Sequence, residues 1–169
     1  KIKKGLKMEI INVQTPRGLV LKGAIWGDTS MDTVVIMMSG ICSNVFQNEL
    51  LPEAGKVLSE NGIAFIAGQT MDAFSFISYS NTKTGKQTTT GVVTDDFSMS
   101  YEDVESYVKY AKDLGFKKII LAGHSLGSNR VIHYLANTAD NYVNNFIISA
   151  PVDLRHFFDI IPDKEIYLE

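Results

Sequence analysis

The stretch that decides the fold of this chain is residues 118–127, Lys-Ile-Ile-Leu-Ala-Gly-His-Ser-Leu-Gly. Its first five residues form a largely apolar run typical of a buried strand, and residues 128–137 have the pattern of a helix. The Gly-x-Ser-x-Gly pentapeptide between them predicts a tight turn that strains the backbone of Ser125 and pushes its hydroxyl out of the sheet. Gly123 and Gly127 are small enough for the strand and the helix to approach each other. The stretch therefore predicts a nucleophile elbow with Ser125 at its tip.

The rest of the chain alternates strand and helix patterns, which indicates a single α/β domain over residues 1–169. We expect a mostly parallel sheet with helices on both faces. Alternating polar and apolar residues on either side of residues 16–18 predict an antiparallel hairpin at the sheet edge. The expected strands cover residues 8–14, 19–26, 33–38, 63–67, 118–122 and 146–149, and the expected helices cover 48–61, 100–114 and 128–137.

Helical spacing also predicts which side chains two of the helices bury. The helix at 100–114 begins with a capping-box-like Ser-Tyr-Glu-Asp. Its expected buried face consists of Val104, Val108, Ala111 and Leu114. The buried face expected for the elbow helix consists of Val131, Ile132 and Leu135.

A long polar stretch, residues 68–95, follows the strand at 63–67 and is rich in Thr, Ser and Gly. A structureless loop of this length is unusual inside a compact domain. One interpretation is a surface excursion or a small hairpin. The other is a loop that forms a wall of the substrate pocket, because the stretch leaves the carboxyl end of a strand, where α/β sheets bind ligands.

Two further segments fit the elbow. Residues 37–44 read Met-Met-Ser-Gly-Ile-Cys-Ser-Asn, and residues 147–154 read Ile-Ile-Ser-Ala-Pro-Val-Asp-Leu. With them, residues 8–154 resemble the N-terminal part of an α/β-hydrolase-fold serine hydrolase, similar to esterases of the serine-aminopeptidase-like and DUF1749-like groups. The resemblance implies that the chain is truncated after the strand that follows the elbow, and that later strands and any cap belong to a longer parent protein.

The resemblance implies a catalytic role for Ser125 and two backbone N–H donors for the oxyanion that forms on the substrate. One donor is the residue after the serine, Leu126, and the other is Ile41 in the loop after the third strand. Relatives usually carry a histidine where this chain has Ser39. That departure weakens the bracing of the loop more than it affects the donor, which is a backbone group. Cys42, beside this loop, is expected to be a buried and inert residue.

The acid and the histidine of a catalytic triad are expected beyond residue 169, because their order in this fold is serine, acid, histidine. Asp153 follows the last strand, where some members carry the acid, although a turn residue is the commoner role there. His124 lies within the elbow, His133 is expected on the solvated face of the elbow helix, and His156 at the entry to a lid or cap. The 169 residues are therefore expected to be inactive by themselves.

Composition narrows the classes of function. A net charge of −3 without a basic stripe argues against nucleic-acid binding, and no apolar stretch is long enough to span a membrane. The single cysteine excludes an internal disulfide and is compatible with a cytoplasmic location. No metal or cofactor is expected, and the oligomeric state is left open.

These features predict a serine hydrolase that cleaves carboxylic esters or thioesters through an acyl-enzyme on Ser125. Two alternatives stay open. One is a catalytically inactive binding protein that keeps the elbow as a scaffold, which Ser39 in place of histidine favours. The other is an acyltransferase or a peptidase, since the same residues serve acyl transfer and amide cleavage.

Overall fold

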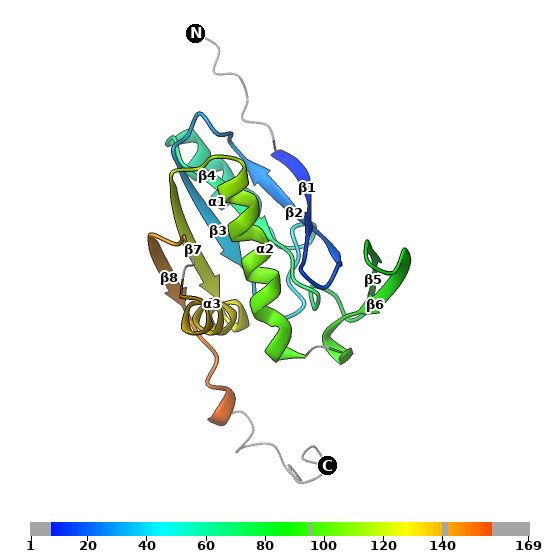
Figure 1. Ribbon diagram of the computed structural model, residues 1–169. Coiled ribbons are helices and arrows are strands. Elements are labelled where there is room, and N and C mark those ends of the chain that lie inside the picture. The colour runs from blue at the N-terminus through cyan, green and yellow to red at the C-terminus, as the bar shows by residue number, and fades with distance from the viewer. Residues whose placement is uncertain (1–7, 95, 140–141, 157–169) are drawn as a thin grey trace.

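The computed structural model describes residues 8–94, 96–139 and 142–156. Its centre is a six-stranded sheet in the order β1-β2-β4-β3-β7-β8 (Figure 1). The strands are β1 (Met8–Gln14), β2 (Val20–Trp26), β3 (Thr33–Met38), β4 (Ala64–Gly68), β7 (Lys118–His124) and β8 (Asn145–Ser149). β4, β3, β7 and β8 are parallel, whereas β2 pairs antiparallel with both β1 and β4. The α/β class and the edge hairpin are therefore confirmed.

Helices cover both faces of this sheet, as its continuous apolar strands require. α2 (Ser100–Asp113) and α3 (Leu126–Asn137) lie on one face, and α1 (Leu50–Glu60) lies on the other (Figure 1). Side chains of the central strands alternate between two cores. Ile36 and Ile66 pack with Val104 under α2 and α3, and Phe65 packs with Leu51 of α1.

The polar stretch after β4 contains a hairpin. β5 (Ile77–Asn81) and β6 (Lys86–Thr90) pair antiparallel as a separate ribbon beside the main sheet (Figure 1). Two short 3-10 turns, Val92–Thr94 and Phe97–Met99, lead from it into α2. The hairpin interpretation is thus correct for residues 77–90, but residues 69–73 are all buried and are no surface excursion.

Two positions expected in the core are exposed. Leu114 lies just past the end of α2, where the chain turns at Gly115 with a φ of +96°, and Phe116 takes the buried position instead. Ile132 is 47% exposed because the buried stripe of α3 runs through Val131 and Tyr134.

The start of α2 also differs from the expected capping box. A 3-10 turn runs directly into the helix, and the residue before it, Met99, makes no side-chain cap. The cap belongs to the 3-10 turn, where the Asp96 carboxylate accepts the Ser98 N–H (3.0 Å). The acidic residues of the motif, Glu102 and Asp103, bind Arg17 instead. The acidic residues of the expected capping box therefore bind the side chain of Arg17, which is distant in the sequence, and not a backbone N–H at the start of their own helix.

Candidate active site

Ser125 lies at the junction of β7 and α3, in the sharp turn that the sequence predicts. Its φ of 54° and ψ of −132° are far from the ordinary regions for a residue with a side chain. The Ser125 N–H donates to the Ser149 carbonyl in β8 (3.0 Å), and the Ser125 carbonyl accepts the Ser128 N–H (2.9 Å). These bonds hold the strained backbone between a strand and the first turn of a helix. Ser125 is half-buried, and it lies neither in the core nor within the helix.

Two glycines allow β7, the turn and α3 to pack this closely. A Cβ on Gly123 would lie 2.6 Å from the carbonyl oxygen of Gly127, and a Cβ on Gly127 would lie 2.1 Å from the carbonyl oxygen of Met38. A real Cβ does not come so close to backbone atoms, so a side chain at either position would force the elements apart. Gly40 is restricted as well, though by a side chain, since a Cβ there would lie 2.9 Å from Ser125 Cβ and 3.2 Å from Ser125 Oγ.

The loop after β3 lies beside this elbow. β3 and β7 are neighbours in parallel register, with Met38 opposite Gly123, so the two strands end together. Residues 39–44 therefore leave the sheet next to the elbow and not at a distant edge. Ile41 in this loop and Leu126 at the start of α3 thus belong to two adjacent segments, as the resemblance requires of two oxyanion donors.

Residues 40–43 form a hydrogen-bonded turn, which we call the oxyanion turn after the role that the resemblance implies for Ile41. The Ser43 N–H donates to the Gly40 carbonyl (3.2 Å), and Cys42 has a positive φ of 54°. The Cys42 N–H donates to the carbonyl of Asp72 (3.3 Å), in the segment after β4. Cys42 is exposed, so the expectation of a buried cysteine is wrong. The reason is its place in a tight turn at the edge of the sheet, where the backbone is held and the side chain is left outside the core.

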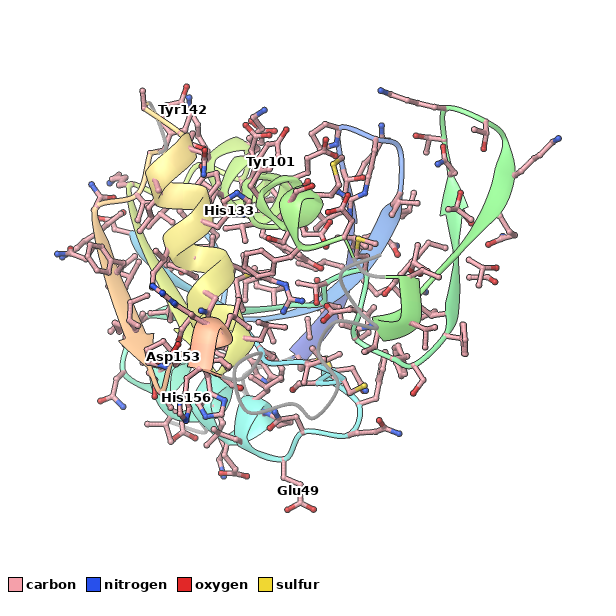
Figure 2. The ribbon with its side chains drawn as sticks, turned by 90° about the horizontal axis from the view of Figure 1, so that it is seen from below. Glu49, Tyr101, His133, Tyr142, Asp153 and His156 are labelled. Atoms are coloured by element: carbon pink, nitrogen blue, oxygen red, sulfur yellow. The ribbon has the colours of Figure 1, made fainter. Side chains whose placement is uncertain are left out.

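The histidine of α3 has other neighbours. His133 is eight residues after Ser125, which is about 12 Å along the helix axis. Its ring stacks on Phe97, with centroids 5.4 Å apart, and the edge contact with Tyr101 is seen between α3 and α2 in Figure 2. His133 Nδ1 lies 3.5 Å from Ser100 Oγ. It is half-buried in this contact, so the expectation of a solvated outer face is wrong.

Asp153 and His156 lie together in the turn that follows β8 (Figure 2). The His156 N–H donates to Asp153 Oδ1 (2.9 Å), and both residues are exposed. This is the capping contact of an aspartate at the start of a helical turn. In the described part of the chain no histidine is hydrogen-bonded to Ser125, and a triad base and acid beyond residue 169 stay a prediction.

A cavity of about 440 Å³ adjoins the oxyanion turn. Its lining residues come from the turn and from the approach to α1, and they are Cys42, Ser43, Asn44, Gln47, Asn48 and Glu49. Asn44 is buried and holds this loop in shape, because its Oδ1 accepts the N–H groups of Phe46 and Gln47 (both 3.1 Å). The side chains around the cavity are mostly polar, in contrast to the apolar core beneath the sheet.

A buried ion pair lies behind the oxyanion turn. Arg130 of α3 binds the Asp72 carboxylate through its NH2 group, and the two side chains are 1% and 0% exposed. The Thr70 hydroxyl donates to the other oxygen of the same carboxylate. No local sequence pattern predicts this ion pair, because Asp72 lies in a polar stretch and Arg130 lies in an ordinary helix sequence.

A second buried carboxylate anchors the same segment. Asp103 of α2 accepts the Met71 N–H (2.9 Å) and binds Arg17, which also contacts Glu102 (3.1 Å). Burial raises the pKa of the Asp103 carboxyl to about 6, against the opposing effect of the Arg17 guanidinium. Residues 69–73 are thus fixed by charged groups from α2, α3 and the β1–β2 turn.

Two further features bear on function. Among the residues that the structure describes, no three His, Cys, Asp or Glu side chains gather in an arrangement that could hold a metal ion. In the same part of the chain, no helix is both long and apolar enough to cross a membrane.

Solved structures share this architecture. The Pyrococcus furiosus esterase Pf2001 matches with a TM-score of 0.66 and 18% identity, over 96% of this chain and 60% of that protein. The α/β hydrolase GrgF from Penicillium sp. sh18 matches with a TM-score of 0.66 and 21% identity, over 86% and 46%. A predicted CIB-like hydrolase from Thermoplasma acidophilum matches with a TM-score of 0.58 and 15% identity, over 92% and 68%.

The sheet order, the elbow and these matches define the class: the chain has the α/β-hydrolase fold, and it spans 60% of the length of the Pyrococcus esterase. A family profile described as protein of unknown function (DUF1749) matches residues 60–168, so the chain belongs to that family. No curated protein matches the sequence significantly.

Proposed function

We propose that the protein is a serine hydrolase that cleaves carboxylic esters or thioesters through an acyl-enzyme on Ser125. The observation that carries this proposal is the backbone of Ser125, with φ 54° and ψ −132° at the junction of β7 and α3. A serine held in such a conformation costs about 1–3 kcal/mol, and sites of this kind cluster where strain serves chemistry.

The proposed reaction follows from the groups around Ser125. Its Oγ attacks the substrate carbonyl while its proton passes to a histidine base supplied from outside the described residues. The negative charge that develops on the carbonyl oxygen is stabilised by the N–H groups of Ile41 and Leu126. The alcohol or thiol leaves with the proton, and water then cleaves the acyl-enzyme. Gly40 leaves the room that the carbonyl needs beside Oγ.

Two observations favour an ester as the substrate. Ile41, in the turn beside the elbow, is 52% exposed and offers an apolar side chain to an uncharged acyl or alcohol group. Several structural matches are described as esterases, including a cold-adapted esterase from an Arctic intertidal metagenomic library. Identities of 15–18% support the fold of those proteins, and the substrate class is our inference.

The test is hydrolysis of short-chain p-nitrophenyl esters and labelling by a fluorophosphonate, both with the whole protein. Ser125→Ala is expected to abolish labelling and to lower turnover about 10⁴- to 10⁶-fold. Ser98→Ala is the control, because Ser98 is exposed in the turn before α2 and leaves both readouts unchanged. A folded wild-type protein with neither activity nor label would favour the inactive binding protein instead.

A further inference from the structure

We propose that Asp72 and Arg130 are positioning residues that hold the oxyanion turn against the elbow helix, so that the Ile41 N–H points at the reacting carbonyl. This inference rests on the proposed function for its catalytic meaning. Its structural basis is a chain of contacts that runs from α3 through the segment after β4 to the turn after β3.

The direction of the Ile41 N–H is fixed by a neighbouring hydrogen bond. In a planar trans peptide the carbonyl and the N–H point in opposite directions. The Gly40 carbonyl and the Ile41 N–H share one peptide, and that carbonyl accepts the Ser43 N–H (3.2 Å). The oxyanion turn must therefore keep its shape if the Ile41 N–H is to point away from Ser43 and toward the substrate.

That shape has an unfavourable element, because Cys42 adopts a φ of 54° without being glycine. Rotation of the peptide between Ile41 and Cys42 would remove the positive φ, but it would leave the Gly40–Ile41 peptide unchanged, because β-turns with either orientation of the central peptide keep the bond between the first carbonyl and the fourth N–H. The Cys42 N–H belongs to the central peptide, and it donates to the Asp72 carbonyl (3.3 Å). The bond to Asp72 therefore acts on the position of the whole turn, because it ties the residue next to Ile41 to the segment after β4.

Asp72 in turn is held by its side chain. Its carboxylate binds Arg130 NH2 through one oxygen and the Thr70 hydroxyl through the other, and it is fully buried. Arg130 is part of α3, whose first residue follows Ser125 directly. One ion pair therefore keeps the nucleophile and the opposite oxyanion donor in register, although they come from different strands.

A buried ion pair is not by itself a strong source of stability, since apolar replacements of both partners are often neutral. A positioning role and a purely structural role therefore make different predictions. Loss of position lowers kcat for each folded active site, whereas loss of stability lowers only the number of folded sites.

The test uses the whole protein with Asp72→Asn, Arg130→Met and the double variant. Endpoint titration with a fluorophosphonate counts the folded sites, and p-nitrophenyl ester kinetics give kcat and KM for each. We expect kcat to fall about 10- to 100-fold in each single variant, with KM changed less than about threefold, because a displaced donor acts on the transition state. Arg130→Lys, which keeps the charge, is expected to recover part of the loss.

Val108→Ala is the control. Val108 of α2 is fully buried in the apolar core, so its truncation weakens the fold without removing a hydrogen bond of residues 69–73, the ion pair or the oxyanion turn. We expect kcat per site to stay within about twofold. An unchanged kcat per site in the variants of Asp72 and Arg130 would overturn the proposal, and so would an equal loss in Val108→Ala.

Amide hydrogen exchange separates this inference from the proposed function. The Cys42 N–H is expected to exchange at least about tenfold faster in Arg130→Met than in the wild type or in Val108→Ala. If the wild-type protein shows no esterase activity, the proposed function fails while this exchange experiment still decides the structural link. Equal exchange rates in all three proteins would refute that link.

Discussion

The elbow at residues 123–127 and the segment at residues 69–73 both follow strands at the carboxyl edge of the sheet, yet they are held in opposite ways. The elbow is held by the absence of side chains, because backbone packs against backbone at Gly123 and Gly127. The segment is held by side chains, because Asp72 and Met71 bind charged groups from other elements. One site thus depends on steric fit between neighbours and the other on partners brought together by the fold.

The largest loss of stability is expected from adding a side chain to the elbow, where backbone packs against backbone. Gly127→Ala places a Cβ 2.1 Å from the Met38 carbonyl oxygen, which belongs to a central strand and cannot move away. We expect a loss of more than about 4 kcal/mol in the free energy of unfolding, measured by urea denaturation of the whole protein.

Gly62→Ala is the control for this substitution. Gly62 also needs glycine for its φ of +78°, but a Cβ there meets nothing within 4 Å. Only the backbone strain remains, so we expect a loss of about 1–2 kcal/mol. Equal losses in the two variants would show that conformation and not close packing limits the elbow.

Removal of one partner of the buried ion pair is expected to cause the next largest loss of stability. Arg130→Met leaves the Asp72 carboxylate buried without its cation, which costs about 3–5 kcal/mol in comparable cases. Asp72→Asn combined with Arg130→Met removes both charges and is expected to recover at least half of that loss. A double variant that is less stable than Arg130→Met would mean that the pair itself supplies much of the stability of this region.

This contrast explains how far the sequence alone could lead. The apolar patterns predict the strands of the main sheet and the helices α1, α2 and α3 within a few residues because these patterns are local. Glycine spacing is local too, and it predicts the turn at Ser125 correctly. The prediction that Leu114 is buried is wrong because the helix ends one residue earlier and Phe116 fills the core. The prediction that Ile132 is buried is wrong because the buried face of α3 includes Arg130. Arg130 is a charged residue, which helical spacing alone would not assign to a core.

The supports of the site were not predictable in this way. Asp72 lies in a stretch of polar residues whose composition suggests solvent, and its partner comes 58 residues later. His133 carries no local sign that Phe97 and Tyr101 enclose it. Long-range partners of polar side chains follow from the topology, and one sequence does not encode them in any local pattern.

The second buried carboxylate gives the stability of the segment at residues 69–73 a dependence on pH. The pKa of Asp103 in the folded state, about 6, is above its ordinary value of 3.8 because of burial. The folded protein therefore holds this proton more tightly than the unfolded chain. The contribution of Asp103 to stability is greatest below about pH 4 and declines as the pH rises toward 6.

Asp103→Asn tests this sign, since asparagine resembles the protonated carboxyl and still accepts the Met71 N–H. Between pH 4 and pH 6 the wild type is expected to lose on the order of 2 kcal/mol relative to the variant, with a constant difference above pH 7. Urea denaturation at several pH values measures it. A wild type that gains stability over the variant in this range would show that Arg17 outweighs burial.

The smallest expected effect concerns how the β5–β6 hairpin braces the segment. Thr90 is buried, and its hydroxyl donates to the Met71 carbonyl (2.9 Å), whereas Thr89 beside it is exposed and its hydroxyl lies 3.1 Å from the Ser78 hydroxyl. Thr90→Val keeps the shape but leaves that carbonyl without this donor, so we expect a loss of about 1–2 kcal/mol. Thr89→Val, the same change on the outer face, is expected to shift stability by less than about 0.5 kcal/mol. Equal effects would mean that the hairpin packs by shape alone, and residues 69–73 would then be held only by the charged groups of α2, α3 and the β1–β2 turn.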